Sequence, residues 1–175
     1  MEIWDLYDKE GNIIGEHIRG NEMPEGAYHL VVHVWIKDPA GRYLMTRRSR
    51  NKKTCPLKWE CVGGAVTKGE TSLHAAIREV KEEVGIELSP GDTVPVLTRV
   101  RDIVDGKRIN DINDIYIFPY DGEVDLAKAT TDEVDKVAWM DKREIAGLME
   151  RGEMVSVIKD LSYFINEENI FFATS

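Results

Sequence analysis

Alternating apolar and polar positions, with β-branched residues among them, predict three β-hairpins along the chain. The run HLVVHVWI, the turn signal DPAG and the run RYLMT follow one another, so residues 28–47 form one expected hairpin. Residues 3–18 predict a second hairpin around a turn at 9–12, and residues 94–118 predict a third that turns at DGK. KVAWM (136–140) predicts a further short strand. We therefore expect a β-sheet at the centre of the fold.

Helical periodicity begins at Thr71 and stops at Gly85, a glycine suited to the position just after a helix C-terminus. At about 100° per residue, Glu79, Glu82 and Glu83 fall within an arc of about 100° on this helix. The acidic arc borders an apolar stripe, which consists of Leu73, Ala76, Ile77, Val80 and Val84. The acids are therefore expected beside the core rather than opposite it.

Two more helices are predicted near the end of the chain. Asp141 is the expected N-cap of one of them, with Glu144 at the capping-box spacing. Residues 153–166 predict a final amphipathic helix. The segment GGAVTKGE (63–70) is so rich in glycine that we expect it to be irregular.

Length and composition fit one α/β domain. The chain has 175 residues, of which 42% are hydrophobic and 31% are charged, as in soluble globular proteins. We expect a mixed β-sheet with helices before and after its last strands, in a single domain that spans residues 1–175. Residues 1–20 would be an N-terminal β-hairpin extension, and its exposed edges could pair with a second copy to form a homodimer.

Charge is distributed unevenly. The net charge is −9, which argues against a nucleic-acid polymer as a partner. The stretch RRSRNKKTCPLK (47–58) nevertheless carries six Lys or Arg residues and no acid. It is either a solvated basic loop or a source of positive charge for an anionic ligand, and the sequence leaves both open.

We expect a cytoplasmic protein with no membrane partner. The start MEIWDLYDKEG lacks the basic and then apolar segments of a signal peptide, and HLVVHVWI is too short to cross a bilayer. Cys55 and Cys61 have a C-x5-C spacing, which is typical of neither a zinc pair nor a redox motif. Both are expected to be reduced thiols.

Three glutamates on one helix face have an ordinary explanation and a chemical one. Glutamate forms helices well, so a solvated acidic face is the ordinary interpretation. However, like charges at i, i+4 cost about 0.2–0.5 kcal/mol, and the cost grows beside a low-dielectric core. A divalent cation would remove this repulsion, because Mg²⁺ is held by a few carboxylates together with phosphate oxygens and waters.

The spacing of these acids resembles the Nudix box, G-x5-E-x7-R-E-U-x-E-E-x-G-U with U aliphatic. Every specified position is matched within residues 64–86, by Gly64, Glu70, Arg78, Glu79, Val80, Glu82, Glu83, Gly85 and Ile86. The resemblance implies an α/β/α sandwich and hydrolysis of a nucleoside diphosphate, free or linked to another moiety, with Mg²⁺ or Mn²⁺ as cofactor. The partner would then be a small phosphorylated molecule.

The resemblance also implies roles for the matching residues. Glu79, Glu82 and Glu83 would bind the metal, and one of them or a downstream acid would act as the base. A backbone carbonyl of Gly63 or Gly64 would complete the metal site.

Further candidates lie within and beyond the box. Glu70 and Arg78 would orient the metal-binding glutamates by hydrogen bonds and ion pairs. Downstream, Asp114 in NDIND is a candidate extra metal ligand. Glu133 resembles a glutamate that often precedes the corresponding late strand in the family, although surface acids are common in any protein.

Substrate-binding candidates come from the basic stretch and from the strand at 28–36. Arg47, Arg48 and Lys53 could supply positive charge for phosphate groups. One face of the strand could line a cleft in which Trp35 or Tyr28 stacks on a base, or it could be a mixed packing face. That face carries His29, Val31, His33 and Trp35.

Two other functions stay open. The N-terminal segment and the basic stretch resemble the Nudix group that includes isopentenyl-diphosphate isomerase, whose motif has a catalytic Cys closely followed by His-Pro. The matching segment here reads CVGGAV, which lacks both the His and the Pro, so a hydrolase of the isomerase-like group is favoured. Some Nudix-fold domains bind nucleotides without cleaving them, but these typically lose glutamates of the box, and this chain has kept all of them.

Overall fold

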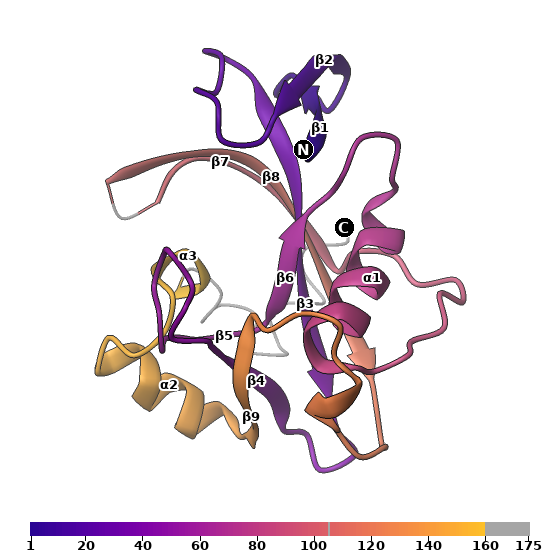
Figure 1. Cartoon of the computed structure of the whole chain (residues 1–175), viewed down its shortest axis with the longest axis vertical. Helices are drawn as coiled ribbons and strands as arrows, with labels where there is room; N and C mark the ends of the chain where they lie inside the picture. The colour runs from indigo at the N-terminus through magenta and orange to yellow at the C-terminus, as the bar shows by residue number, and fades with distance from the viewer. Residues whose placement is uncertain (105, 160–175) are drawn as a thin grey trace.

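The computed structural model describes residues 1–104 and 106–159, which form an α/β/α sandwich around one sheet (Figure 1). Its strands are β1 (Ile3–Tyr7), β2 (Ile13–Ile18), β3 (Tyr28–Lys37), β4 (Tyr43–Arg48), β5 (Trp59–Glu60), β6 (Val62–Ala65), β7 (Leu97–Val104), β8 (Lys107–Pro119) and β9 (Val134–Met140). Its helices are α1 (Ser72–Val84), α2 (Lys142–Glu150) and α3 (Ser156–Lys159), with a short 3-10 helix η1 (Leu126–Lys128). The expected fold class is confirmed.

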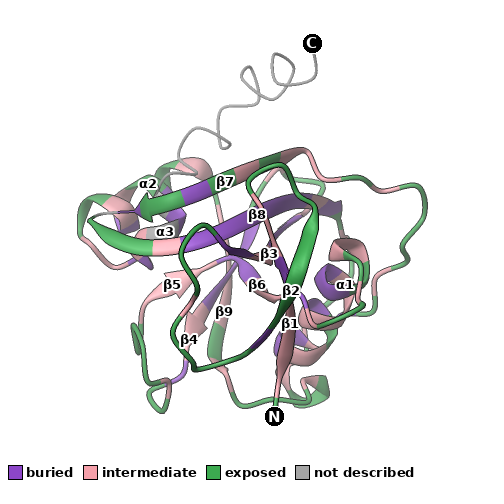
Figure 2. Cartoon of the chain, turned by 90° about the horizontal axis from the view of Figure 1, so that it is seen from above, coloured by how far each residue is buried: buried purple, intermediate pink, exposed green. Residues whose placement is uncertain are grey.

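Strand β3 is the centre of the sheet, because its two faces are both apolar enough to be buried. It pairs in parallel with β8 and antiparallel with β1, β4 and β6, so the sheet is mixed. On one face Val32, Val34 and Ile36 pack against α1. On the other face Trp35 packs with buried residues of α2 and α3. Figure 2 shows β3 and β8 buried in the middle and β2 exposed at the edge.

The two strands of the expected hairpin at 28–47 pair with each other at a single position. Lys37 pairs with Tyr43, and the two strands then separate. The remainder of that edge of β3 is taken by β6 and β1, while β4 turns to pair with β9 and β5. The sequence indicated the strands correctly but not their partners, because long-range pairing replaces the local one.

The expectation that residues 63–70 are irregular is wrong for Gly63, Gly64 and Ala65, which lie in β6. A Cβ on Gly63 would lie 2.4 Å from the carbonyl oxygen of Val32, and one on Gly64 would lie 2.2 Å from a carboxylate oxygen of Glu79. Glycine is used here to let β6 approach β3 and α1 closely, rather than to break the chain.

The other local predictions are confirmed where the structure describes them. Thr71 caps α1 and Gly85 ends it with a φ of 70°, while Asp141 and Glu144 form a capping box on α2. The hairpin of β7 and β8 turns at the expected place, although its residue 105 lies outside the described residues. Helix α3 accounts for part of the predicted helix at 153–166, and residues 160–166 lie outside the described residues.

The N-terminal hairpin extends the sheet. Strands β1 and β2 pair with each other, and β1 also joins β3 through Leu6 and Tyr7. Strand β2 is therefore at the edge, where Ile13 and Ile14 are 64% and 55% exposed. Among the described residues, no helix has the length and apolar character needed to cross a membrane. Cys55 and Cys61 are both free, as expected.

Candidate active site

The acids of α1 face a pocket of about 310 Å³ that is bounded on the opposite side by β6. Of the candidate residues named from the sequence, the structure brings eight to this pocket, namely Arg48, Gly63, Gly64, Arg78, Glu79, Glu82, Glu83 and Glu133. Glu133 reaches the pocket from the position directly before β9. Residues that are far apart in the sequence thus meet because α1 packs across β6 and β3.

Arg78 holds the acidic cluster in place. Its guanidinium donates two hydrogen bonds to the carboxylate of Glu70, from Nε at 2.9 Å and from Nη2 at 3.0 Å. Its Nη1 donates to Glu79 at 2.8 Å and to Glu82 at 3.1 Å, and its Nη2 also donates to the carbonyl of Ala65. These partners raise the pKa of Arg78, so it stays charged.

Glu70 lies behind Arg78 and outside the pocket lining. Burial alone would raise the pKa of Glu70, but hydrogen bonds from Arg78 and Thr67 outweigh it, and the pKa is lowered. Thr67 contributes both its backbone N–H, at 3.1 Å, and its hydroxyl, at 3.0 Å. Glu70 is therefore an ionised anchor for Arg78, which agrees with the orienting role that its place in the box implies.

Glu83 is the most unusual acid of the cluster. It is only 6% exposed, and its Oε2 is buried without a hydrogen-bond partner. Burial, followed by the nearby charges of Glu60, Glu79 and Glu133, raises its pKa well above the ordinary value. The pKa of Glu79 is also raised by burial, in spite of the opposing effect of Arg78. Such crowding is unfavourable unless positive charge compensates it.

This donor set fits a divalent cation. The carboxylates supply hard oxygen ligands, the unpaired oxygen of Glu83 lacks a partner, and Gly64 leaves space that a Cβ would fill beside Glu79. Within residues 1–104 and 106–159, no three His, Cys, Asp or Glu side chains are already gathered as a metal cluster. Arg78 Nη1 instead bridges Glu79 and Glu82, so cation binding requires these side chains to rearrange.

The basic residues divide into those inside and those outside the pocket. Arg48 lines it and donates to Glu60 at 2.6 Å, and Lys52 lines it in an ion pair with Glu133. Arg47 instead pairs with Asp135, and Lys53 is exposed, so neither lines the pocket. Nothing in the sequence distinguishes Lys52 from its neighbour, since only the path of the loop decides which one turns inward.

Two further predicted residues lie elsewhere. Asp114 is buried and accepts a hydrogen bond from Thr98 at 2.5 Å, and it does not line the pocket. Trp35 does not offer a stacking surface, because it is 2% exposed and packs edge-on against Tyr43 in the core. The hydroxyl of Tyr28, the other stacking candidate, donates to Asp102.

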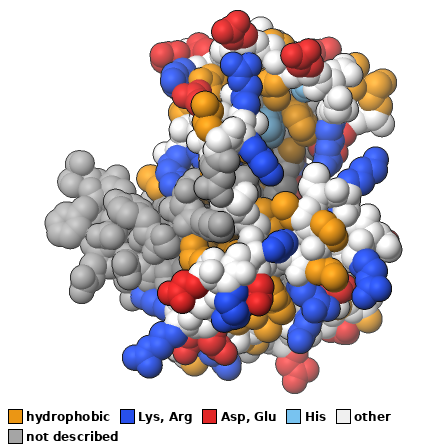
Figure 3. Space-filling view, turned by 90° about the vertical axis from the view of Figure 1, so that its left-hand side faces the viewer, with side chains coloured by type: hydrophobic (Ala, Val, Ile, Leu, Met, Phe, Trp, Pro, Cys, Tyr) orange, Lys and Arg blue, Asp and Glu red, His pale blue; other side chains and the backbone are white. Residues whose placement is uncertain are grey.

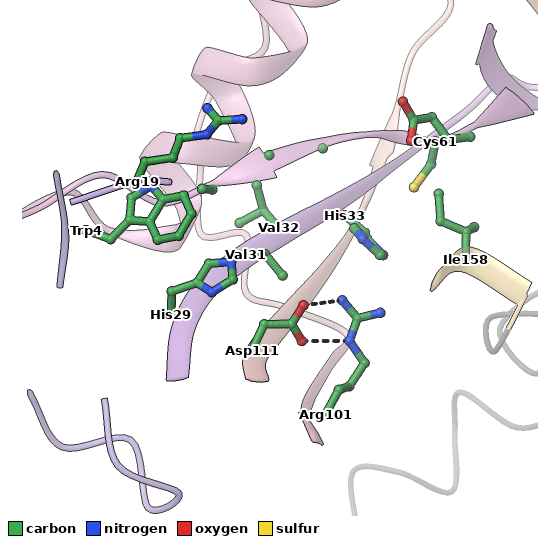
Figure 4. Close-up of a pocket in the computed structure, with 14 residues that line it drawn as sticks. Trp4, Arg19, His29, Val31, Val32, His33, Cys61, Arg101, Asp111 and Ile158 are labelled. Carbon is green, nitrogen blue, oxygen red and sulfur yellow. Dashed lines mark hydrogen bonds and ion pairs between the residues drawn. The ribbon is translucent and has the colours of Figure 1, made fainter. Parts of the chain in front are cut away.

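A second pocket of about 260 Å³ adjoins the first, and the two share Arg19 and the β6 residues 63–65. We call it the histidine pocket, because His29 and His33 project into it from β3 (Figure 4). The sequence indicated that this face of β3 could line a cleft. It did not indicate the pocket's other walls, to which Trp4, Arg19, Arg101 and Asp111 contribute.

Burial keeps both histidines of this pocket neutral. Burial, with Arg101 and Arg99 nearby, lowers the pKa of His33 to about 3, and burial also lowers the pKa of His29. His29 stacks on Trp4 with ring centroids 4.3 Å apart. Beneath them, Arg101 and Asp111 form a buried ion pair with contacts of 2.7 and 2.6 Å.

On the face that carries α2 and α3, Lys and Arg side chains of the described residues are interspersed with acids (Figure 3).

Comparison with known proteins gives the family. The model of the NUDIX domain matches residues 27–161. An uncharacterised Nudix hydrolase of Listeria innocua is 31% identical over 169 residues, which cover 95% of this chain and 93% of that protein. A crystal structure from Deinococcus radiodurans has the same fold, with a TM-score of 0.74 at 21% identity over 95% of this chain and 98% of that one.

Two further similarities involve a bifunctional enzyme and an isomerase. A bifunctional NMN adenylyltransferase/ADP ribose pyrophosphatase of Francisella tularensis, solved with AMP and a Mn ion, matches 79% of this chain and 42% of that one, with a TM-score of 0.58 and 20% identity. An isopentenyl-diphosphate Delta-isomerase of Escherichia coli is 34% identical over 67 residues, which cover 38% of this chain and 37% of that enzyme. This short match does not assign the isomerase-like subgroup. The family model, which spans most of the chain, and the Listeria relative show that this chain belongs to the Nudix family and is a Nudix hydrolase.

Proposed function

We propose that the protein hydrolyses a nucleoside diphosphate, free or linked to another moiety, by attack of water on a phosphorus of the diphosphate, and that the reaction depends on Mg²⁺ or Mn²⁺. The observation that carries this proposal is Glu83, a buried carboxylate with an unpaired oxygen beside two further glutamates. A permanently crowded acidic cluster at the wall of a pocket is costly, and a bound cation is what would offset that cost.

In this proposal Glu79, Glu82 and Glu83 hold the cation, together with a backbone carbonyl of Gly63 or Gly64. When bound, the cation neutralises phosphate charge and makes a water molecule more nucleophilic. Arg78 keeps two of the glutamates in position, and Glu70 in turn fixes Arg78.

Positive side chains in the same pocket complement the phosphates. Arg48 and Lys52 line it, and each is held there by an ion pair with an acid. Arginine and lysine bind phosphate oxygens by charge-assisted hydrogen bonds. A protein of net charge −9 needs such local positive charge, in addition to the cation, to hold an anionic substrate.

The proposal is tested with a panel of nucleoside diphosphates, dinucleoside polyphosphates, nucleotide sugars and dinucleotide cofactors. We expect Mg²⁺-dependent release of a phosphorylated product by the wild type. Glu83→Gln should lower kcat by at least about 100-fold, the upper end of what the outer-shell partners of metal ligands contribute. Thermal unfolding should show that this variant still folds, because glutamine has nearly the same shape as glutamate.

Glu87→Gln is the matched control, because Glu87 is exposed, lies just beyond α1 and pairs with Lys81 outside the pocket. Its kcat should equal that of the wild type. Turnover by Glu83→Gln at the wild-type rate would refute the metal-site assignment. Conversion of isopentenyl diphosphate into its allylic isomer, with no hydrolysis of the panel, would favour the isomerase instead. Nucleotide binding without any turnover would favour a sensor.

A further inference from the structure

The histidine pocket is placed to receive a group attached to the diphosphate. It meets the pocket of the acidic cluster along β6, since residues 63–65 and Arg19 line both. A diphosphate bound at the glutamates would therefore have one of its substituents at the entrance of the histidine pocket. Trp4 and Arg19 of the N-terminal hairpin stand at one end of it, and Cys61 and Ile158 at the other (Figure 4).

Two of the side chains that line the histidine pocket carry a buried polar atom without a partner. The Nδ1 atoms of His29 and His33 are both buried and have no hydrogen-bond partner, and His33 is only 8% exposed. Leaving such an atom unsatisfied costs about 1–3 kcal/mol, so a buried polar atom without a partner calls for an explanation. A ligand that hydrogen-bonds to these rings would supply the missing partner.

The charges around the histidine pocket are already balanced. Of the described residues that line it, four are charged, and each forms an ion pair: Arg101 with Asp111, Arg19 with Glu2, and Glu60 with Arg48. The two arginines and two acids of the described lining cancel in charge, so their sum favours neither a cationic nor an anionic group. Its volume of about 260 Å³ lies below the roughly 300–1,000 Å³ of pockets that hold whole drug-sized ligands, so it has room for about one ring.

We infer that the histidine pocket selects substrates whose diphosphate carries an uncharged, hydrogen-bonding ring, with His33 as the residue that recognises that ring. The ring is either the sugar joined to the far phosphate or the base of the nucleotide itself, because both present neutral donors and acceptors at their edges. This inference rests on the proposed function, since it assumes that the diphosphate lies at the acidic cluster.

The test compares the binding of three ligands by calorimetry, with Ca²⁺ in place of Mg²⁺ to slow turnover. UDP-glucose carries rings at both ends of its diphosphate, CDP-choline carries a nucleoside at one end and a cationic chain at the other, and isopentenyl diphosphate carries no ring. We expect wild-type protein to bind UDP-glucose more tightly than isopentenyl diphosphate. His33→Phe should weaken UDP-glucose binding about tenfold, the loss expected for an unmatched polar contact. His33→Asn should restore part of the affinity, because its amide can place a polar atom near the position of Nδ1.

The CDP-choline result distinguishes the two sources of the ring. If the base enters the pocket, His33→Phe weakens CDP-choline and UDP-glucose equally, and if the sugar enters it, only UDP-glucose is affected. His74→Phe is the matched control, since His74 is exposed on α1 and does not line the pocket. The inference is overturned if His33→Phe weakens all three ligands alike, if it weakens none, or if the wild type does not prefer UDP-glucose.

A misfolded variant is separated from a specific effect by a second measurement on the wild type. Titration with UDP-glucose should shift the imidazole ¹⁵N resonances of His33, while isopentenyl diphosphate leaves them in place. Unshifted resonances on saturation with UDP-glucose would also overturn the inference. The proposed function is tested separately, because it requires Mg²⁺-dependent turnover that Glu83→Gln strongly lowers, whereas the present test measures binding alone.

Discussion

At the scale of single residues, Arg78 has the most contacts to explain. Its guanidinium donates hydrogen bonds to three glutamates and one backbone carbonyl around the pocket. Two carboxylates of the proposed metal site, those of Glu79 and Glu82, and the carboxylate of Glu70 accept hydrogen bonds from its planar fork of donors. Arg78 is 30% exposed and is itself saturated with acids, so it has little capacity left to bind a substrate phosphate. We therefore propose that Arg78 positions the glutamates.

We predict that Arg78→Ala lowers kcat about 10- to 100-fold, as the loss of outer-shell partners of metal ligands typically does. The Mg²⁺ concentration needed for half-maximal activity should rise, because Glu79 and Glu82 lose the group that orients them. Arg78→Lys should recover only part of the activity, since an ammonium group keeps the charge but not the fork. Steady-state kinetics over a range of Mg²⁺ concentrations measure both effects. An unchanged Mg²⁺ dependence with only a raised KM would show a role in substrate binding instead.

Residues in local motifs were predictable at this scale, whereas residues brought in by the tertiary fold were not. The positions of Glu79, Glu82 and Glu83 follow from helical spacing, and Arg78 from the box. Lys52 could not be distinguished from Lys53, because their difference arises from the course of one loop. The neutral state of His33 likewise depends on burial by segments that are distant in sequence.

At the scale of elements, β6 lines both pockets, and its two glycines lie too close to neighbouring atoms to accept a Cβ without a shift. A Cβ on Gly63 would meet the backbone carbonyl of Val32, which cannot move without separating β6 from β3. A Cβ on Gly64 would meet the carboxylate of Glu79, which is the far end of a flexible side chain. The sequence suggested an irregular loop here, because glycine usually disfavours strands and the close packing of α1 against β6 was not visible in the pattern.

Alanine should therefore affect stability at one of these two glycines and activity at the other. Gly63→Ala should lower the free energy of unfolding by about 1–3 kcal/mol, the usual cost of overpacking. Gly64→Ala should change stability less but lower kcat/KM strongly, because Glu79 must leave its position. Denaturant unfolding and hydrolysis assays of both variants separate the two effects. Equal loss of stability in both variants would contradict the distinction between a rigid backbone contact and a mobile side chain.

At the scale of the whole molecule, the two sides of the N-terminal hairpin differ in what they contact. Its inner side contributes Glu2, Trp4 and Arg19 to the two pockets, which ties the hairpin to the proposed site. Its outer strand β2 pairs only with β1 among the described strands and exposes Ile13 and Ile14. An exposed edge with apolar side chains is a common template for pairing with another strand.

We predict that two copies of the chain associate through β2. The backbone groups along the outer edge of β2 would then find partners, and Ile13 and Ile14 would be removed from water. Light scattering of the purified protein at micromolar concentration should give the mass of a dimer, and Ile13→Lys should give that of a monomer, because a charge on an edge strand opposes pairing. Val94→Lys is the control, since Val94 is 70% exposed but lies outside the strands. A monomeric wild type, or a dimer that Ile13→Lys leaves intact, would show that β2 is not the interface.

Because β1 carries Trp4 toward the histidine pocket while β2 faces outward, dissociation by Ile13→Lys should leave kcat/KM near the wild-type value.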